Sequence, residues 1–148
     1  MRRSGVHGHG VFATRALRAG DGIGRYAGRL YAPDETHDEW DDRLTYLFGL
    51  SNGSMIDGAQ GGNATRHLNH ACEPNVKAIE EYAADALVVV ICATRNIDAG
   101  EELFLDYALD VDGDDPAAYP CACGSTRCRG TLVGRASDPV SLDDNPLA

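Results

Sequence analysis

The sequence predicts a mainly β protein, because many short β-like segments alternate with turn residues and few stretches have the period of a helix. Glycine is abundant, with 17 residues among 148. Glycine-rich turns between short apolar segments are typical of small sheets rather than of helical bundles. A chain of this length fits one domain with one hydrophobic core.

The first half of the chain predicts loops and short strands. Residues 5–14 predict a glycine-rich loop that enters a strand, and residues 22–31 predict a strand broken at Gly28, where a bulge or close packing favours glycine. An acidic helix is expected over residues 34–44, after Pro33. Residues 44–50 and 54–57 are expected to be strands joined by a tight Asn-Gly turn.

The second half contains the most apolar segment. One helical turn is expected within residues 63–69. Residues 76–82 and 86–93 predict a hairpin, and the second strand is apolar enough to be buried on both faces. Residues 102–107 predict a further short strand. The acidic residues 110–120 and the residues from 136 onward predict a loop and a loose tail.

The net charge of −10 argues against a surface that follows nucleic-acid phosphates, since such binding depends on Lys and Arg. A basic protein partner is favoured, and two acidic runs could steer it. These runs contain Asp34, Glu35, Asp38, Glu39, Asp41 and Asp42, and Asp110, Asp112, Asp114 and Asp115. Solvated loops and a helix face would explain either run equally well.

The start of the sequence lacks the apolar run of a signal peptide, and no later stretch approaches the length of a membrane span. We therefore expect an intracellular protein without membrane contact, cytoplasmic in a prokaryote or nuclear in a eukaryote.

Cysteine spacing predicts a metal site. Cys121, Cys123 and Cys128 lie in one short loop, and the total of five cysteines fits a reducing compartment better than a disulfide framework. Structural zinc takes four thiolate or imidazole ligands, so a fourth ligand must come from elsewhere in the chain. A loose thiol loop or a redox pair of cysteines is the competing interpretation.

Two polar clusters give the strongest functional signal. Arg-His-Leu-Asn-His-Ala-Cys-Glu-Pro-Asn occupies residues 66–75, and Gly-Glu-Glu-Leu-Phe-Leu-Asp-Tyr occupies residues 100–107. Together with the cysteine loop that follows, they resemble the signature of SET-domain protein-lysine methyltransferases with a zinc-binding post-SET segment. The resemblance covers residues 5–134.

The resemblance implies a domain organisation and a fold. A SET domain would occupy residues 1–109, an acidic loop and the post-SET segment residues 110–134, and a flexible tail residues 135–148. The fold would consist of small curved sheets with a pseudoknot, in which the stretch carrying Tyr107 threads through the loop that contains Asn69 and His70.

The resemblance also implies a zinc site and a cofactor site. Cys72 would complete the zinc site with Cys121, Cys123 and Cys128, although His70 is a competing donor. The Gly-His-Gly segment does not open a helix as a dinucleotide fingerprint would. It matches instead the first SET motif, so the resemblance implies S-adenosylmethionine as the cofactor. The implied cofactor-binding residues are Gly8, His9, Gly10, Tyr46, Arg66, Asn69, His70, Tyr107 and Leu132.

The implied reaction transfers a methyl group to the side-chain amine of lysine in a basic protein, of which a histone-like protein is one candidate. Tyr107 and Tyr26 would be the catalytic residues that orient the amine. The amine must be neutral, whereas lysine has a reference pKa of about 10.4, so an apolar channel beside a sulfonium would favour the reactive form. Tyr107 need not be a general base, since water can remove the proton.

Two other functions compete. A catalytically silent SET-like module could bind basic proteins through its acidic surface. A hydrolase could use Cys72 and His70, but the zinc role competes for Cys72 and no oxyanion element is evident.

Overall fold

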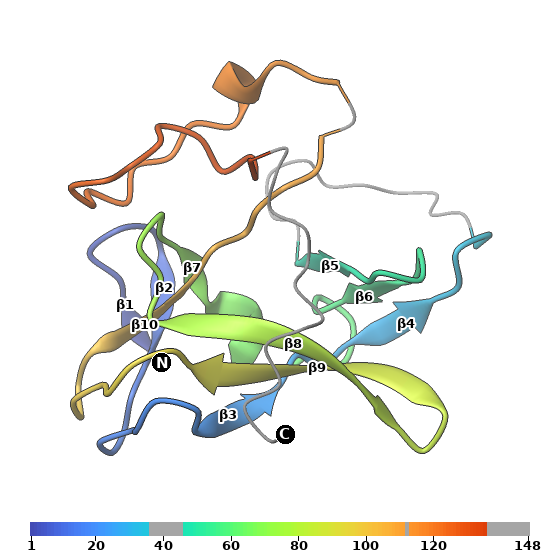
Figure 1. Cartoon of the computed structure of the whole chain (residues 1–148), viewed down its shortest axis with the longest axis horizontal. Coiled ribbons are helices and arrows are strands. Elements are labelled where there is room, and N and C mark those ends of the chain that lie inside the picture. Colours follow the sequence, from blue (N-terminus) through green and yellow to red (C-terminus); the bar gives the residue numbers. More distant parts are fainter. Residues whose placement is uncertain (36–45, 112, 136–148) are drawn as a thin grey trace.

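The computed structural model describes residues 1–35, 46–111 and 113–135. These residues form ten short strands, two 3₁₀ turns and no α-helix, so the expected mainly β fold is confirmed (Figure 1). The strand orders of the three sheets are β1-β2-β10-β7, β3-β9-β8 and β4-β6-β5. The strands are β1 (Arg2–Arg3), β2 (His9–Phe12), β3 (Gly22–Arg25), β4 (Arg29–Tyr31), β5 (Leu47–Gly49), β6 (Met55–Asp57), β7 (Asn69–His70), β8 (Val76–Ala83), β9 (Ala86–Ala93) and β10 (Glu102–Leu105).

The β8–β9 hairpin supplies much of the core. Its two strands pair along their full length, and the tip residues Ala84 and Asp85 both have positive φ, as a type I′ turn requires. Val89 and Ile91 are fully buried, whereas the alternate residues of β9 are only half-buried. The expectation that both faces of β9 are buried is therefore wrong, because this antiparallel sheet covers the core with one face.

The predicted break at Gly28 separates two strands that belong to different sheets, β3 and β4. The bulge lies in β3, between Gly22 and Gly24, and not at Gly28. A Cβ atom at Gly28 would lie 2.2 Å from the carbonyl oxygen of Asp57. The glycine was predicted to serve either a bulge or close packing. Close packing of two backbones is therefore the reason for glycine at position 28.

The predicted β5–β6 hairpin is present, and Gly53 in its turn has a φ of 86° and donates its N–H to the Leu50 carbonyl. The expected helical turn is the 3₁₀ turn η1 (Ala64–His67), capped by the Asn63 side chain. A second 3₁₀ turn, η2 (Pro116–Ala118), lies in the predicted acidic loop. Most of the predicted helix over residues 34–44, and the tail from residue 136, lie outside the described residues.

The loop of residues 69–75 packs against β10 at both of its ends. β7 pairs with β10 in parallel, with Asn69 opposite Phe104. At the other end, the Asn75 side chain accepts the Phe104 N–H at 2.7 Å and donates to the Glu102 carbonyl at 2.8 Å. Asn75 is buried, so these bonds are shielded from water. The strand that leads to Tyr107 is therefore held against this loop.

Residues 113–135 stand above the sheets as a separate loop region (Figure 1). This C-terminal segment, residues 113–135, folds back on itself through the Pro120–Thr131 bridge and meets the body through the Leu109–Val133 bridge. No side chain of residues 113–135 is fully buried, so cross-links rather than a core must hold this segment. Within the described residues, no helix has the length and hydrophobicity to span a membrane.

Candidate active site and metal site

Asn69 ties the glycine loop before β2 to the body. Its side-chain nitrogen lies 3.0 Å from the carbonyl oxygens of both His7 and His9 and 3.1 Å from Glu102 Oε1. Gly10 allows this approach, because a Cβ atom there would lie 2.0 Å from Glu102 Oε1 and 3.3 Å from the Asn69 nitrogen. The predicted residues Gly8, His9 and Gly10 are thus brought to Asn69 by backbone contacts.

Tyr107 follows β10 and is fixed at both ends. Its N–H donates to His70 Nδ1 at 3.0 Å, and its hydroxyl donates to the Leu68 carbonyl at 2.7 Å. Burial raises the pKa of the Tyr107 phenol to about 12. The hydroxyl is therefore neutral near pH 7, and the bond to Leu68 fixes its orientation.

The His70 imidazole connects Tyr107 to the cysteine loop. Burial lowers its pKa below the usual range, against the opposing effect of Asp106. The neutral ring accepts the Tyr107 N–H at Nδ1, so its proton is on Nε2, which lies 3.4 Å from Cys72 Sγ. His70 thus supports the backbone at Tyr107 and the sulfur of Cys72 at once.

Tyr26 lies between β3 and β4 and donates its hydroxyl to the Tyr46 carbonyl at 2.7 Å. Burial and the neighbouring Tyr107 raise the Tyr26 pKa above its usual range. The Tyr26 phenol is therefore also neutral at pH 7.

Arg66 lies beside the tyrosines rather than beside a carboxylate. Its guanidinium is 5.7 Å from the centre of the Tyr46 ring and donates to the Gly58 carbonyl at 3.3 Å. Among the described residues, no carboxylate pairs with Arg66. The cation–π contact holds Tyr46 against η1.

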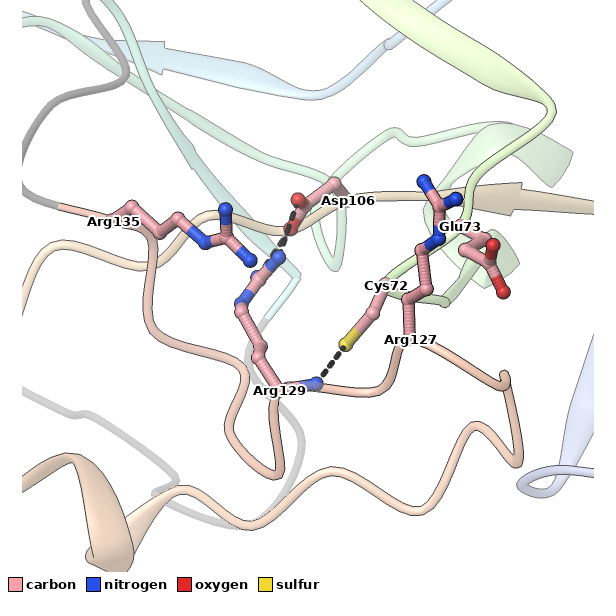
Figure 2. A pocket seen from close by; sticks show the side chains of 6 residues that line it. All are labelled: Cys72, Glu73, Asp106, Arg127, Arg129 and Arg135. Carbon is pink, nitrogen blue, oxygen red and sulfur yellow. Dashed lines mark hydrogen bonds and ion pairs between the residues drawn. The ribbon is translucent and has the colours of Figure 1, made fainter.

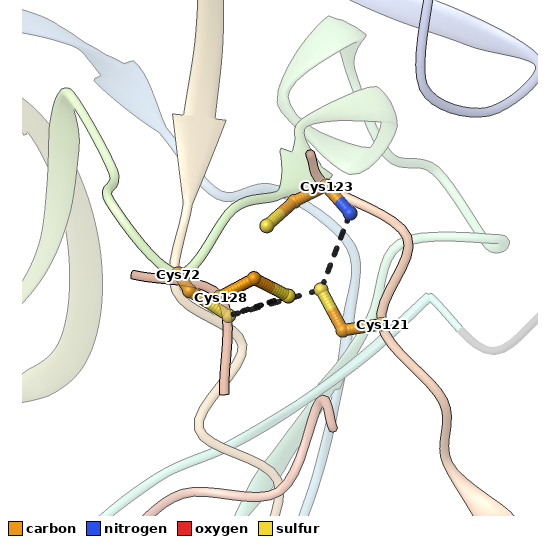
Figure 3. A group of neighbouring side chains, drawn as sticks. All are labelled: Cys72, Cys121, Cys123 and Cys128. Atoms are coloured by element: carbon orange, nitrogen blue, oxygen red, sulfur yellow. Dashed lines mark hydrogen bonds between the residues drawn. The ribbon is translucent and has the colours of Figure 1, made fainter. Parts of the chain in front are cut away.

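Four thiols converge on one point (Figure 3). The sulfur atoms of Cys72, Cys121, Cys123 and Cys128 all lie within 4.8 Å of one another. Cys72 Sγ is 3.7 Å from Cys121 Sγ and 3.9 Å from Cys128 Sγ. Sulfurs bound tetrahedrally to zinc at about 2.3 Å lie about 3.8 Å apart, so the cluster has the chemistry and size of a closed structural zinc site. Cys72, and not His70, provides the fourth group.

Leu132 is joined to the body through its backbone. Its carbonyl accepts the Leu109 N–H at 3.0 Å, and its own N–H donates to Tyr119 at 2.8 Å. In the described part of the chain, no hydrogen bond joins Leu132 to another predicted cofactor-binding residue.

Four residues support this site although the sequence did not predict them: Leu68, Glu102, Asp106 and Arg129. Asp106 accepts a two-pronged ion pair from Arg129, with N–O distances of 2.7 and 2.6 Å. The available signal was position alone, since Asp106 precedes Tyr107 and Arg129 follows Cys128. Leu68 contributes only its carbonyl, which no side-chain pattern reveals.

Small sheets, the packing of residues 69–75 against β10, and a four-thiol cluster close to the His70–Tyr107 contact define a SET-type domain. The family model described as SET domain matches residues 8–108. The chain therefore belongs to the SET-domain family.

Similar proteins carry histone-lysine methyltransferase names. "Histone-lysine N-methyltransferase trithorax" of Drosophila virilis is 35% identical over 135 residues, which covers 88% of this chain and 3% of that protein. "Histone-lysine N-methyltransferase 2B" of Homo sapiens is 35% identical over 135 residues, covering 88% and 5%. "Histone-lysine N-methyltransferase, H3 lysine-4 specific" of Saccharomyces cerevisiae is 32% identical over 136 residues, covering 88% and 13%. The chain thus spans a small part of each relative.

One similar solved structure is described as "ctPRC2 in an autoinhibited conformation bound to S-adenosylmethionine". It has a TM-score of 0.63 and 29% sequence identity, and the match covers 72% of this chain and 14% of that chain.

Proposed function

We propose that this chain transfers a methyl group from S-adenosylmethionine to the side-chain amine of lysine in a basic protein. Residues 1–109 would act as the SET domain, and residues 110–134 as the post-SET segment. The observation that carries the proposal is the attachment of Tyr107 to His70 and Leu68, beside the Asn69-bound glycine loop. Membership of the SET family and the S-adenosylmethionine-bound structural relative support it.

Cofactor binding would use the two surfaces that flank β7. The glycine loop offers backbone groups at Gly8, His9 and Gly10, held in place by Asn69. The segment around Leu132 would cover the site from the other side. Tyr46 and Arg66, which contact each other, would complete the binding surface together with His70.

The methyl donor supplies an electrophilic carbon on a sulfonium. The lysine amine must lose a proton to water before it reacts, and its nitrogen lone pair then forms the new N–C bond while the C–S bond breaks and a thioether leaves. Tyr26 and Tyr107 would orient the amine. Both phenols stay protonated near pH 7, because burial raises both pKa values, so positioning rather than base catalysis is their expected contribution.

Zinc would be structural in this proposal. Cys72 belongs to the body and the other three thiols to the C-terminal segment, so one Zn²⁺ would fasten that segment beside the active site. A thiol surrounded by three others suits a metal ligand better than a nucleophile, which argues against the hydrolase interpretation.

A basic lysine-bearing protein is the proposed substrate class. The chain has 23 acidic and 13 basic residues, and a negative surface attracts such a partner. The names of the relatives make a histone-like protein the first candidate substrate. This protein would then act at chromatin.

The proposal is tested by incubating the purified protein with labelled S-adenosylmethionine and either histones or whole-cell extract, followed by mapping of modified lysines. Label on lysine, lost with Tyr107→Phe, is the expected result. A protein that binds basic proteins and does not bind the methyl donor would instead be a silent SET-like module.

A further inference from the structure

We propose that Asp106 and Arg129 form a clamp that closes the C-terminal segment over the active site and sets the affinity for the methyl donor. They act as positioning residues, and this role rests on the proposed function.

The clamp joins the two parts of the chain directly. Asp106 lies between β10 and Tyr107 in the body, whereas Arg129 lies in the C-terminal segment. Arg129 Nη1 and Nη2 bind the two Asp106 oxygens at 2.7 and 2.6 Å (Figure 2). Such two-pronged contacts fix the relative orientation of the two side chains as well as the distance between them.

Arg129 also organises the segment itself. Its Nε donates to the Val133 carbonyl at 3.0 Å, and its backbone N–H lies 3.5 Å from Cys72 Sγ. The residues between Arg129 and Val133 include Leu132, whose carbonyl is bound by the Leu109 N–H. One side chain thus closes the turn that would cover the cofactor and attaches it to the body.

Burial distinguishes this pair from the surface ion pairs. The Arg129 and Asp106 side chains are 14% and 28% exposed, against 53% and 34% for Arg95 and Glu101. Exposed pairs contribute little because water and salt screen them. A partly buried, doubly bonded pair is screened less, so removing one partner should have a measurable effect.

The clamp should affect donor binding more than the chemical step. Tyr107 has its own bonds to His70 and Leu68, which do not involve Arg129. The C-terminal segment, by contrast, meets the body at residues 106–109, at the thiols and through a Thr126–Glu73 contact, and the Asp106–Arg129 pair is one of these few attachments. Loss of the clamp therefore loosens the segment while Tyr107 stays in place.

Arg127 is the matched control. It lies on the other side of Cys128 and lines the same open pocket of about 270 Å³ as Arg129, yet it makes no ion pair with Asp106 (Figure 2). Substitution of Arg127 removes the same charge from the same segment without breaking the clamp.

The test uses Asp106→Asn, Arg129→Gln, their double variant and Arg127→Gln, each checked for zinc content. We expect the Kd for S-adenosylmethionine, measured by calorimetry, to rise about tenfold in both single variants and no further in the double variant, since both remove the same contact. The single-turnover rate at saturating donor should fall less than about threefold, and Arg127→Gln should match wild type.

Three outcomes would overturn the inference: equal behaviour of Arg129→Gln and Arg127→Gln, loss of turnover at unchanged Kd, or loss of zinc from the clamp variants. Hydrogen exchange of residues 129–133 tests the clamp independently of the proposed function. If wild type binds no donor, the donor-affinity claim fails with the proposed function, while faster exchange in Asp106→Asn than in Arg127→Gln still supports the closing contact, and equal exchange refutes it.

Discussion

The hydroxyl of Tyr107 donates a 2.7 Å hydrogen bond to the carbonyl oxygen of Leu68. A phenol has one proton to donate, so the oxygen can act only as an acceptor toward any other group. An acceptor at this point suits an incoming amine, which brings N–H donors. The backbone of Leu68, the residue that follows the 3₁₀ turn η1, therefore determines how this tyrosine can be used.

Tyr107→Phe should keep donor binding and lose turnover. The ring remains, so the Kd for S-adenosylmethionine should stay within about twofold, while the single-turnover rate should fall about a hundredfold for the loss of one oriented polar group. Tyr82→Phe is the control, because Tyr82 is 76% exposed on the β8–β9 hairpin. Equal rates in the two variants would rule out the assignment.

The pH dependence of the methylation rate should follow the protonation of the substrate lysine and not that of the tyrosines. Burial raises the pKa of Tyr107 to about 12, so its protonation does not change between pH 7 and pH 9. The neutral fraction of a lysine with a pKa near 10.4 rises about tenfold per pH unit there. We expect the rate under subsaturating peptide to rise with this slope in wild type and in Tyr107→Phe. A slope present in wild type and absent in the variant would show that Tyr107 itself titrates.

Local patterns in the sequence were enough for much of the fold. The β8–β9 hairpin, the turn at Gly53 and the need for glycine at position 28 follow from apolar periodicity and turn chemistry, which act between near neighbours. The half-exposed face of β9 did not follow, because partial cover depends on which distant segments pack there.

The supporting contacts of the site were not predictable for the same reason. The four-thiol cluster could be predicted from the residue type and from the order of the motifs in the SET family. The structure brings Cys72 to Cys121, which lies 49 residues further along the chain. The pairing of Asp106 with Arg129 depends on the path of the C-terminal segment, which no periodicity specifies. Leu68 acts through its backbone, so its identity carries no signal.

Asn69→Ala should weaken both the attachment of the glycine loop to the body and the binding of the methyl donor. The side-chain nitrogen serves the His7 and His9 carbonyls and Glu102, and loss of such buried bonds costs about 1–3 kcal/mol. Thermal unfolding and calorimetry with S-adenosylmethionine should both show the loss. Glu102→Gln is the control, because its amide oxygen can still accept from Asn69. If Asn69→Ala binds the donor as wild type does, the glycine loop is not part of the cofactor site.

Zinc removal should release the C-terminal segment without unfolding the body. Cys72→Ser, or a chelator, should abolish bound zinc, increase proteolysis within residues 113–135 and weaken donor binding, because three of the four thiols lie in that segment. The β8–β9 core contains no ligand and should keep its cooperative unfolding. Cys92→Ser is the control, since Cys92 lies in β9 outside the cluster. Zinc content that is unchanged in Cys72→Ser would exclude Cys72 as the fourth ligand.

Gly28→Ala should destabilise the fold through backbone contact alone. The added methyl would lie 2.2 Å from the Asp57 carbonyl oxygen and 2.8 Å from the Gly58 nitrogen, so β4 and β6 must separate. Overpacking of this kind costs about 1–3 kcal/mol, which denaturant unfolding can measure. Gly49→Ala adds the same methyl to the same sheet with no atom within 4 Å, and it should unfold like wild type. Equal stability of the two variants would mean that β4 and β6 are not packed as closely as the structure has them.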